Sequence, residues 1–86
     1  MSNIIIYGPR ASGKTTQADL LANFYNKRVV DDWFGRDKHS NCVLLTDINH
    51  PNAIKLSNAL KEIQKDRPND LFLAKAIAHA LAVENA

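Results

Sequence analysis

The chain has 86 residues, of which 45% are hydrophobic and 23% are charged, and its formal net charge at pH 7 is +2. This composition is that of an ordinary globular protein and excludes a disordered chain, while so small a charge does not indicate nucleic acid as a partner. A chain of this length builds one small hydrophobic core, so we expect residues 1–86 to form a single domain.

The cysteine content and the apolar runs bear on the compartment. Cys42 is the single cysteine, which excludes an internal disulfide and a cysteine-rich metal site and fits a reducing interior. No apolar run approaches the length that crosses a bilayer, and no charged-then-apolar leader precedes the first predicted strand. We therefore expect a cytoplasmic protein with no membrane partner.

The first predicted element is a strand over residues 3–7, whose centre is three consecutive isoleucines. Such a run is typical of a strand in the middle of a parallel sheet, where both faces are covered. The next eight residues, Gly-Pro-Arg-Ala-Ser-Gly-Lys-Thr, fit the pattern G-x-x-x-x-G-K-[ST] of the phosphate-binding P-loop. A helix predicted over residues 16–26 follows, which completes the strand, loop and helix that the motif requires.

The P-loop pattern predicts a binding site for the phosphates of a nucleotide. Two glycines let the backbone turn tightly, and its N–H groups then point at phosphate oxygens near the positive end of the next helix. Lys14 is expected to act catalytically as a charge on the β- and γ-phosphates, and the Thr15 hydroxyl to ligate Mg²⁺. The alternative is an inherited loop that only holds structure or a stray anion. The residues expected to contact ATP or GTP are Gly8, Pro9, Arg10, Ala11, Ser12, Gly13, Lys14, Thr15 and Thr16.

A second strand is predicted over residues 28–33, and two adjacent carboxylates, Asp31 and Asp32, lie near its end. Because the carboxyl ends of parallel strands meet at one edge of a sheet, both are expected near the P-loop. Side chains alternate along an extended strand, so one carboxylate should face the site and the other away, with Asp31 slightly favoured. Its predicted role is a general base toward an acceptor hydroxyl or an outer-shell Mg²⁺ ligand, and the alternative is a solvated strand end.

The third strand, predicted over residues 42–47, has four apolar residues followed by Thr46 and Asp47. This looks like the second signature of P-loop proteins, Walker B. In that signature an aspartate ends a strand next to the P-loop strand and holds Mg²⁺, usually through water. We therefore expect Asp47 to be a metal ligand together with Thr15.

Two further helices are predicted in the C-terminal half. A helix with one apolar face covers residues 53–63, with Asn52 as its N-cap, and Pro68 prevents it from continuing. Asp70 is expected to cap the last helix, over residues 71–83. The apolar arc of that helix is wide for so small a domain. It therefore lies across a whole face of the sheet or meets a partner, either a second copy in a homodimer or a host protein.

Residues 8–25 resemble the start of the adenylate-kinase-like and shikimate-kinase-like branch of P-loop kinases. The likeness lies in Gly8-Pro9, Gly13-Lys14, Thr16-Gln17-Ala18 and Leu20-Leu21, and Asp31 and Asp32 stand where that branch often carries a substrate-side aspartate. The chain departs from that branch in having three predicted strands where a complete kinase has at least five. It also has no lid segment, no arginine-rich loop after the third strand and no later strand with a base-recognition loop.

Most of the chain also resembles small P-loop proteins of bacterial phages and prophages that are described as AAA-type ATPases. The shared pattern is a P-loop, then Val-Val-Asp-x-Trp-x-Gly-Arg at residues 29–36, then an apolar strand leading to His-Pro at residues 50–51. This resemblance implies a phage-encoded nucleotide-binding protein and no particular reaction.

Together these features predict a minimal α/β P-loop fold, a three-layer sandwich with about three parallel strands in the order 2-3-1 and three main helices. The last helix or a second copy should cover the open edge beside the first strand. The leading expected function is ATP or GTP binding, with the nucleotide as a switch or a structural ligand. One alternative is a minimal kinase or NTPase that carries out Mg²⁺-dependent phosphoryl transfer. The other is a protein-interaction module, such as a phage inhibitor of a host system, with a vestigial P-loop.

Overall fold

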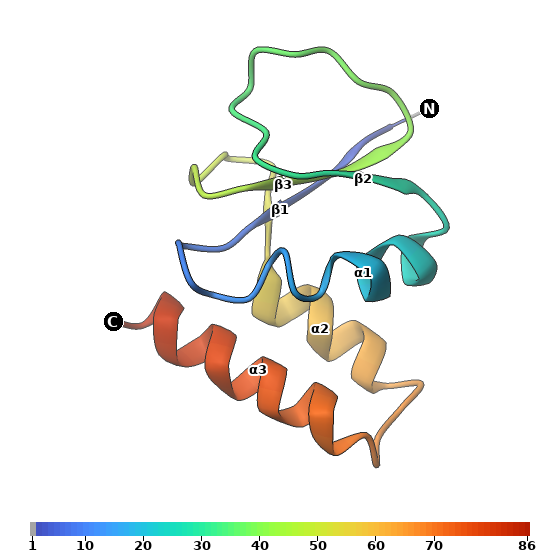
Figure 1. Cartoon of the computed structure of the whole chain (residues 1–86), viewed down its shortest axis with the longest axis vertical. Helices are drawn as coiled ribbons and strands as arrows, with labels where there is room; N and C mark the ends of the chain where they lie inside the picture. The colour runs from blue at the N-terminus through green and yellow to red at the C-terminus, as the bar shows by residue number, and fades with distance from the viewer. Residues whose placement is uncertain (1) are drawn as a thin grey trace.

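The computed structural model describes residues 2–86 and shows a small α/β protein with a four-stranded parallel sheet and three helices (Figure 1). No helix within these residues is long and apolar enough to cross a membrane. The strands are β1 (Ile4–Tyr7), β2 (Arg28–Val30), β3 (Cys42–Thr46) and β4 (Ile54–Lys55). The helices are α1 (Ala18–Tyr25), α2 (Leu56–Gln64) and α3 (Leu71–Glu84).

The strand order is β2-β3-β1-β4, which confirms the predicted order of the first three strands. The fourth strand corrects the prediction, because β4 pairs with the edge of β1 that was expected to be covered by the last helix or a second copy. Its two residues were counted as the start of a helix. A strand this short carries no alternating pattern of its own, and only the neighbouring backbone of β1 makes it extended.

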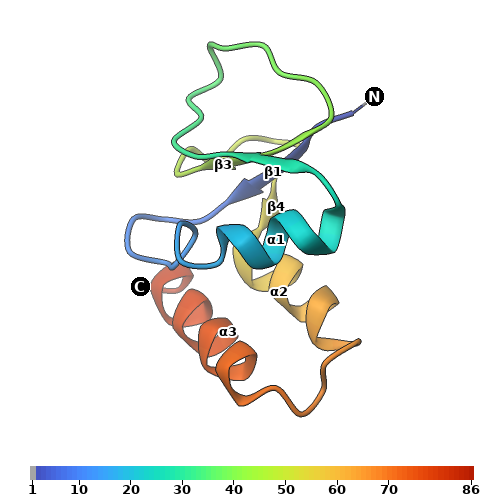
Figure 2. The ribbon, with the colours of Figure 1, turned by 45° about the vertical axis from the view of Figure 1, so that its right-hand side comes forward.

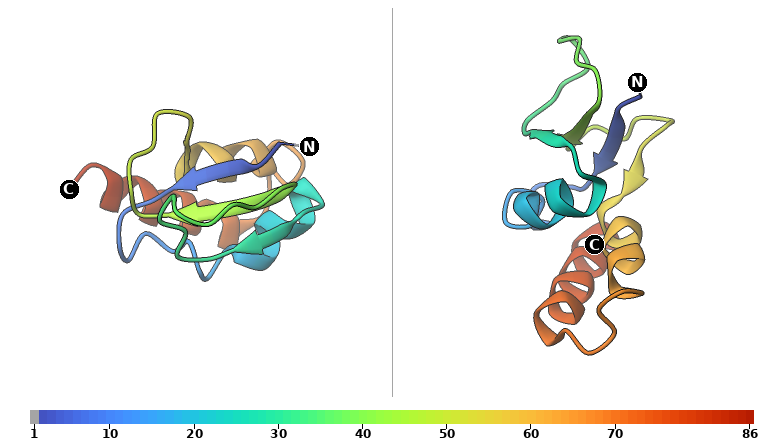
Figure 3. Two further views of the ribbon diagram at one scale, coloured as in Figure 1. Left: turned by 90° about the horizontal axis from the view of Figure 1, so that it is seen from above. Right: turned by 90° about the vertical axis from the view of Figure 1, so that its right-hand side faces the viewer.

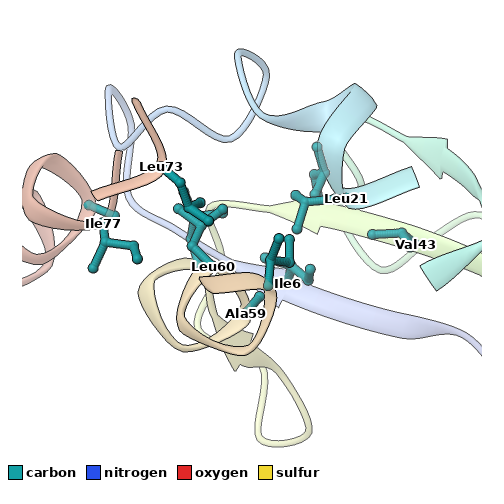
Figure 4. Packing of buried hydrophobic residues seen from close by; sticks show 11 residues of the cluster. Ile6, Leu21, Val43, Ala59, Leu60, Leu73 and Ile77 are labelled. Carbon is teal, nitrogen blue, oxygen red and sulfur yellow. The ribbon is translucent and has the colours of Figure 1, made fainter. Parts of the chain in front are cut away.

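The helices gather on one face of the sheet. Viewed from above in the left panel of Figure 3, the strands lie in front of the helices, and Figure 2 shows the helices together below the sheet. The core agrees with this arrangement. Ile6, Leu45 and Val43 share one face of β1 and β3 and form one buried cluster with Leu21 of α1 and Leu60 of α2 (Figure 4). The expected sandwich, with helices on both faces, is therefore wrong in its layers.

The last helix lies against α2 and not across the sheet. Leu73 and Ile77 of α3 complete the buried cluster from the far side of α2, on the left of Figure 4. The two helices run antiparallel, and they are joined at their open ends by a carboxylate. Glu84, at the end of α3, accepts hydrogen bonds from the Ser57 backbone nitrogen (3.1 Å) and the Ser57 hydroxyl (2.7 Å) at the start of α2.

The caps of the two C-terminal helices were predicted with mixed success. Asp70 caps α3 as expected, since its side chain accepts a hydrogen bond from the Leu73 backbone nitrogen. Asn52 does not cap α2, because β4 intervenes and the N-cap is Lys55, which contributes no side-chain bond. Glu84 supplies the acceptor instead, from a residue far along the chain. Near-neighbour patterns cannot reveal such a cap.

Candidate functional site

The predicted P-loop, residues 8–15, lies at the carboxyl end of β1, beside the end of β3. The Gly8 backbone nitrogen donates to the Thr46 carbonyl oxygen (3.1 Å), which extends the pairing of the two strands into the loop. The loop then turns sharply, with left-handed φ angles of 65° at Ala11 and 98° at Gly13. Left-handed backbone is rare for a residue with a Cβ, so Ala11 marks a conformation that the surrounding structure must enforce.

The turn brings the second half of the loop back over its start. A Cβ placed on Gly8 would overlap the Ser12 hydroxyl and come within 3.0 Å of the Lys14 side chain. Only glycine allows this close approach. The predicted glycine therefore has a specific steric role at this position.

Lys14 folds its ammonium group against the loop. Its Nζ donates hydrogen bonds to the carbonyl oxygens of Gly8 and Pro9, the latter at 3.1 Å. Burial lowers the pKa of the Lys14 ammonium from its ordinary value, while the negative charges of Asp47, Asp31 and Asp32 act in the opposite direction. The charge is thus held inside the loop and is partly removed from solvent, where its field is stronger than on an open surface.

A pocket of about 340 Å³ opens beside Lys14 and gathers the predicted acidic residues. It brings three strand ends together, as expected for a parallel sheet. The Thr15 hydroxyl donates to the carboxylate of Asp31 at 2.9 Å. The residues that line this acidic pocket are Arg10, Ala11, Lys14, Thr15, Asp31, Asp32, Phe34 and Asp47.

Both adjacent carboxylates line the acidic pocket, although only one was expected to face it. The predicted alternation fails because β2 ends at Val30, so neither aspartate lies on extended strand. Asp32 adopts a left-handed φ of 53°, and its backbone nitrogen donates to the Asp31 carboxylate at 2.8 Å. This small turn holds Asp31 toward Thr15 while Asp32 also reaches the pocket.

The oxygen atoms of the acidic pocket match the preference of Mg²⁺. Thr15, Asp31 and Asp47 offer hydroxyl and carboxylate oxygens, which are hard ligands, and Mg²⁺ usually binds one or two carboxylates plus waters and phosphate oxygens. Across residues 2–86, no cluster of three or more His, Cys, Asp or Glu side chains forms a metal site by itself. The donors fit a Mg²⁺ ion that is shared with a bound phosphate better than a site made wholly by protein.

A second pocket, of about 440 Å³, lies on the other side of the same loop, against α3. His79 of α3 connects the helix to the loop, because its Nε2 lies 2.6 Å from the Ala11 carbonyl oxygen. This contact joins residues 68 positions apart, and the histidine spacing gave no sign of it. The residues that line this α3 pocket are Ala11, Ser12, Gly13, Thr16, Gln17, Phe72, Lys75, Ala76 and His79.

The two pockets share seven of the nine predicted phosphate-contacting residues, and Gly8 and Pro9 line neither. Arg10, Lys14 and Thr15 line the acidic pocket, whereas Ser12, Gly13 and Thr16 line the α3 pocket. Ala11 lines both. The helix expected to start at residue 16 begins two residues later, after turns in which the Gln17 nitrogen donates to the Gly13 carbonyl oxygen (3.0 Å).

The α3 pocket residues Phe72, Lys75 and His79 were not predicted as site residues. Their spacing places them on one side of a helix, but that pattern is equally expected of an exposed helix face. Which face meets the P-loop depends on how α3 packs on α2. The sequence carries no local signal for that packing.

No protein-family model matches the chain, and the comparisons with curated proteins and with solved structures found no match. Any function must therefore be inferred from the residues and geometry described above.

Proposed function

We propose that this protein binds ATP or GTP together with Mg²⁺, with the triphosphate seated on the loop formed by residues 8–15. The observation that carries the proposal is the acidic pocket, where Lys14 and Thr15 meet the carboxylates of Asp31 and Asp47. A triphosphate and a divalent cation need both kinds of charge side by side. Bound nucleotide then acts as a switch or as a structural ligand.

The polar side chains of the acidic pocket have three roles in this proposal. Lys14 exchanges its carbonyl partners for the β- and γ-phosphates, since a phosphate oxygen offers a full negative charge where a carbonyl offers a dipole. Thr15, with Asp31 and Asp47, holds Mg²⁺, which neutralises part of the phosphate charge when bound. The second carboxylate, Asp32, also lines the pocket and can accept a proton or bind a hydrated cation.

A minimal kinase or NTPase is the first alternative. Asp31 or Asp32 then serves as general base toward an acceptor hydroxyl or a water molecule, while Lys14 stabilises the transferred phosphoryl group. Most of the acceleration of phosphoryl transfer comes from positioning and charge stabilisation. In residues 2–86 the fourth strand leads directly into α2, so it supplies none of the kinase segments that the sequence lacks.

A protein-interaction module with a vestigial loop is the second alternative, and one observation favours it. Leu71 and Phe72, at the start of α3, are 74% and 85% exposed, which suits a host protein or a homodimer contact. In this case loss of Lys14 would leave partner binding unchanged. The proposal and both alternatives share two further parts. One is the phage origin that the resemblance implies, and the other is a reducing cytoplasm, which suits the buried cysteine Cys42 without a disulfide.

Thermal unfolding with and without Mg-ATP or Mg-GTP tests the proposal. A ligand present at 100 times its dissociation constant adds about 2.7 kcal/mol, which raises the Tm of a domain this small by about 10–20 °C. Lys14→Ala should abolish the shift. Lys61→Ala, an exposed lysine of α2 outside both pockets, should retain it.

The controls also separate the alternatives. A wild-type protein that shows no shift at millimolar nucleotide would contradict nucleotide binding and leave the interaction module. Phosphate release that requires both Lys14 and Mg²⁺ would establish the enzymatic alternative. A shift without release would establish binding alone.

A further inference from the structure

The α3 pocket adjoins the phosphate-binding loop on the side opposite the acidic pocket. Its volume of about 440 Å³ lies within the range of about 300–1,000 Å³ found for small-molecule sites. Figure 2 shows the loop and the C-terminal part of α3 side by side, and the His79 contact with the Ala11 carbonyl oxygen fixes that approach. A ligand on the loop therefore has a cavity at each end.

The placement of charge gives a bound nucleotide one direction. Lys14, Thr15 and the carboxylates are all in the acidic pocket, so the γ-phosphate and its cation belong there. The opposite end of a triphosphate then crosses the loop toward Ser12 and Thr16, which line the α3 pocket. Whatever is attached to the α-phosphate enters that pocket.

The lining of the α3 pocket suits a nucleoside. Phe72 is 85% exposed, so its ring is open for a base to stack on, and stacking tolerates any base because each has a π face. Lys75 and Gln17 bring hydrogen-bonding groups to the same cavity.

One polar group at the pocket awaits a partner. The Ser12 hydroxyl is buried, with the residue only 2% exposed, and it makes no hydrogen bond within the described part of the protein. A buried hydroxyl without a partner is costly, and rotation of the Ser12 side chain away from Gly8 would let a ligand on the loop supply that partner. Ser12 lines the α3 pocket next to Ala11, which lines both pockets, so it lies near the α-phosphate and ribose in the proposed arrangement.

We propose that the α3 pocket binds the ribose and base of the nucleotide, with the base stacked on Phe72 and bonded by Lys75 or Gln17. This inference rests on the proposed function, and it assigns selectivity to the last helix of the chain. The occupant is the nucleoside part of a nucleoside triphosphate. Inorganic triphosphate, which lacks that part, does not use the pocket.

Comparing nucleotide with inorganic triphosphate tests this assignment. Titration calorimetry would measure Mg-ATP, Mg-GTP and magnesium tripolyphosphate against the wild type, Phe72→Ala, Lys75→Ala and Leu71→Ala. Loss of the stacking ring should weaken the favoured nucleotide about ten-fold or more and leave tripolyphosphate unchanged. Leu71→Ala is the matched control, because Leu71 is similarly exposed on the same turn but does not line the pocket.

Each outcome gives a distinct answer. Nucleotide binding that is unchanged in both Phe72→Ala and Lys75→Ala, while tripolyphosphate binding still requires Lys14, overturns the α3 pocket and leaves the triphosphate site intact. Equal losses for nucleotide and tripolyphosphate also overturn it, because the helix then only shapes the loop. Absence of binding by all three ligands to the wild type refutes the proposed function itself.

Discussion

Replacing Glu84 should destabilise the whole domain, although the residue lies at the end of the last helix. Its carboxylate accepts two hydrogen bonds from Ser57, which is 1% exposed at the start of α2. Glu84→Ala removes the acceptor for an N-terminal helix donor, at a cost of about 1 kcal/mol. It also leaves a buried hydroxyl without a partner, at a further cost of about 1–3 kcal/mol.

The expected loss in free energy of unfolding is therefore about 2–4 kcal/mol, or a fall in Tm of about 10–30 °C for a domain of this size. Urea unfolding followed by circular dichroism measures it, provided that the slope against denaturant is unchanged. Glu62→Ala is the matched control. Glu62 is a carboxylate of α2 that forms an exposed pair with Lys65, so its removal should cost less than about 0.5 kcal/mol.

A double variant tests the reasoning more closely. If the cost arises from the unpaired Ser57 hydroxyl, then Ser57→Ala should recover about 1 kcal/mol in the Glu84→Ala background but destabilise the wild type. Glu84→Ala within about 0.5 kcal/mol of the wild type would refute the assigned role of this carboxylate. So would a double variant in which the two effects simply add.

Three further predictions concern the proposed nucleotide site. Burial lowers the pKa of Lys14 below its ordinary value of 10.5, so nucleotide affinity should be highest below that lowered pKa and should fall as the pH rises through it. Lys14→Arg stays charged, so a titration of its affinity against pH should lack this decline. Gly8→Ala should weaken nucleotide binding at least ten-fold, because the added Cβ would overlap the Ser12 hydroxyl and reshape the loop, and a retained thermal shift with nucleotide would contradict this steric role. Asp31→Asn should lower the affinity for Mg-nucleotide about ten-fold but leave the affinity for nucleotide in the presence of a chelator unchanged. Asp37→Asn, outside both pockets, should change neither affinity. Equal losses with and without Mg²⁺ would argue against a cation at the Asp31 carboxylate.

The sequence was sufficient to predict the three main strands, the loop that follows the first of them and the gathering of carboxylates near Lys14. These depend on local patterns, because an apolar run that ends in a carboxylate specifies both a buried strand and the edge where it ends. The position of Asp32 was missed because its left-handed backbone ends the strand alternation early. Asparagine and aspartate tolerate that conformation, but residue type alone does not predict where it occurs.

The other errors arise from contacts between distant segments. β4 exists because β1 offers an open edge, and the α2 cap comes from Glu84, 27 residues away from Ser57. The one-sided placement of the helices follows from the packing of α1 and α2 on the same isoleucine face of β1. None of these contacts has a period or a spacing that can be counted along the chain.

The bond between His79 and the Ala11 carbonyl oxygen has a consequence for synthesis of the protein. The loop is synthesised well before its support on α3, because His79 lies 68 positions after Ala11 in the chain. A growing chain can pair β1 with β3 before α3 is synthesised, but at that stage it lacks the helix that contacts Ala11 and lines the α3 pocket. Because such distant contacts form only after much of the intervening chain has been ordered, this side of the loop should become ordered only once α3 has been synthesised. A nascent chain arrested before α3 would then carry the motif without the finished site.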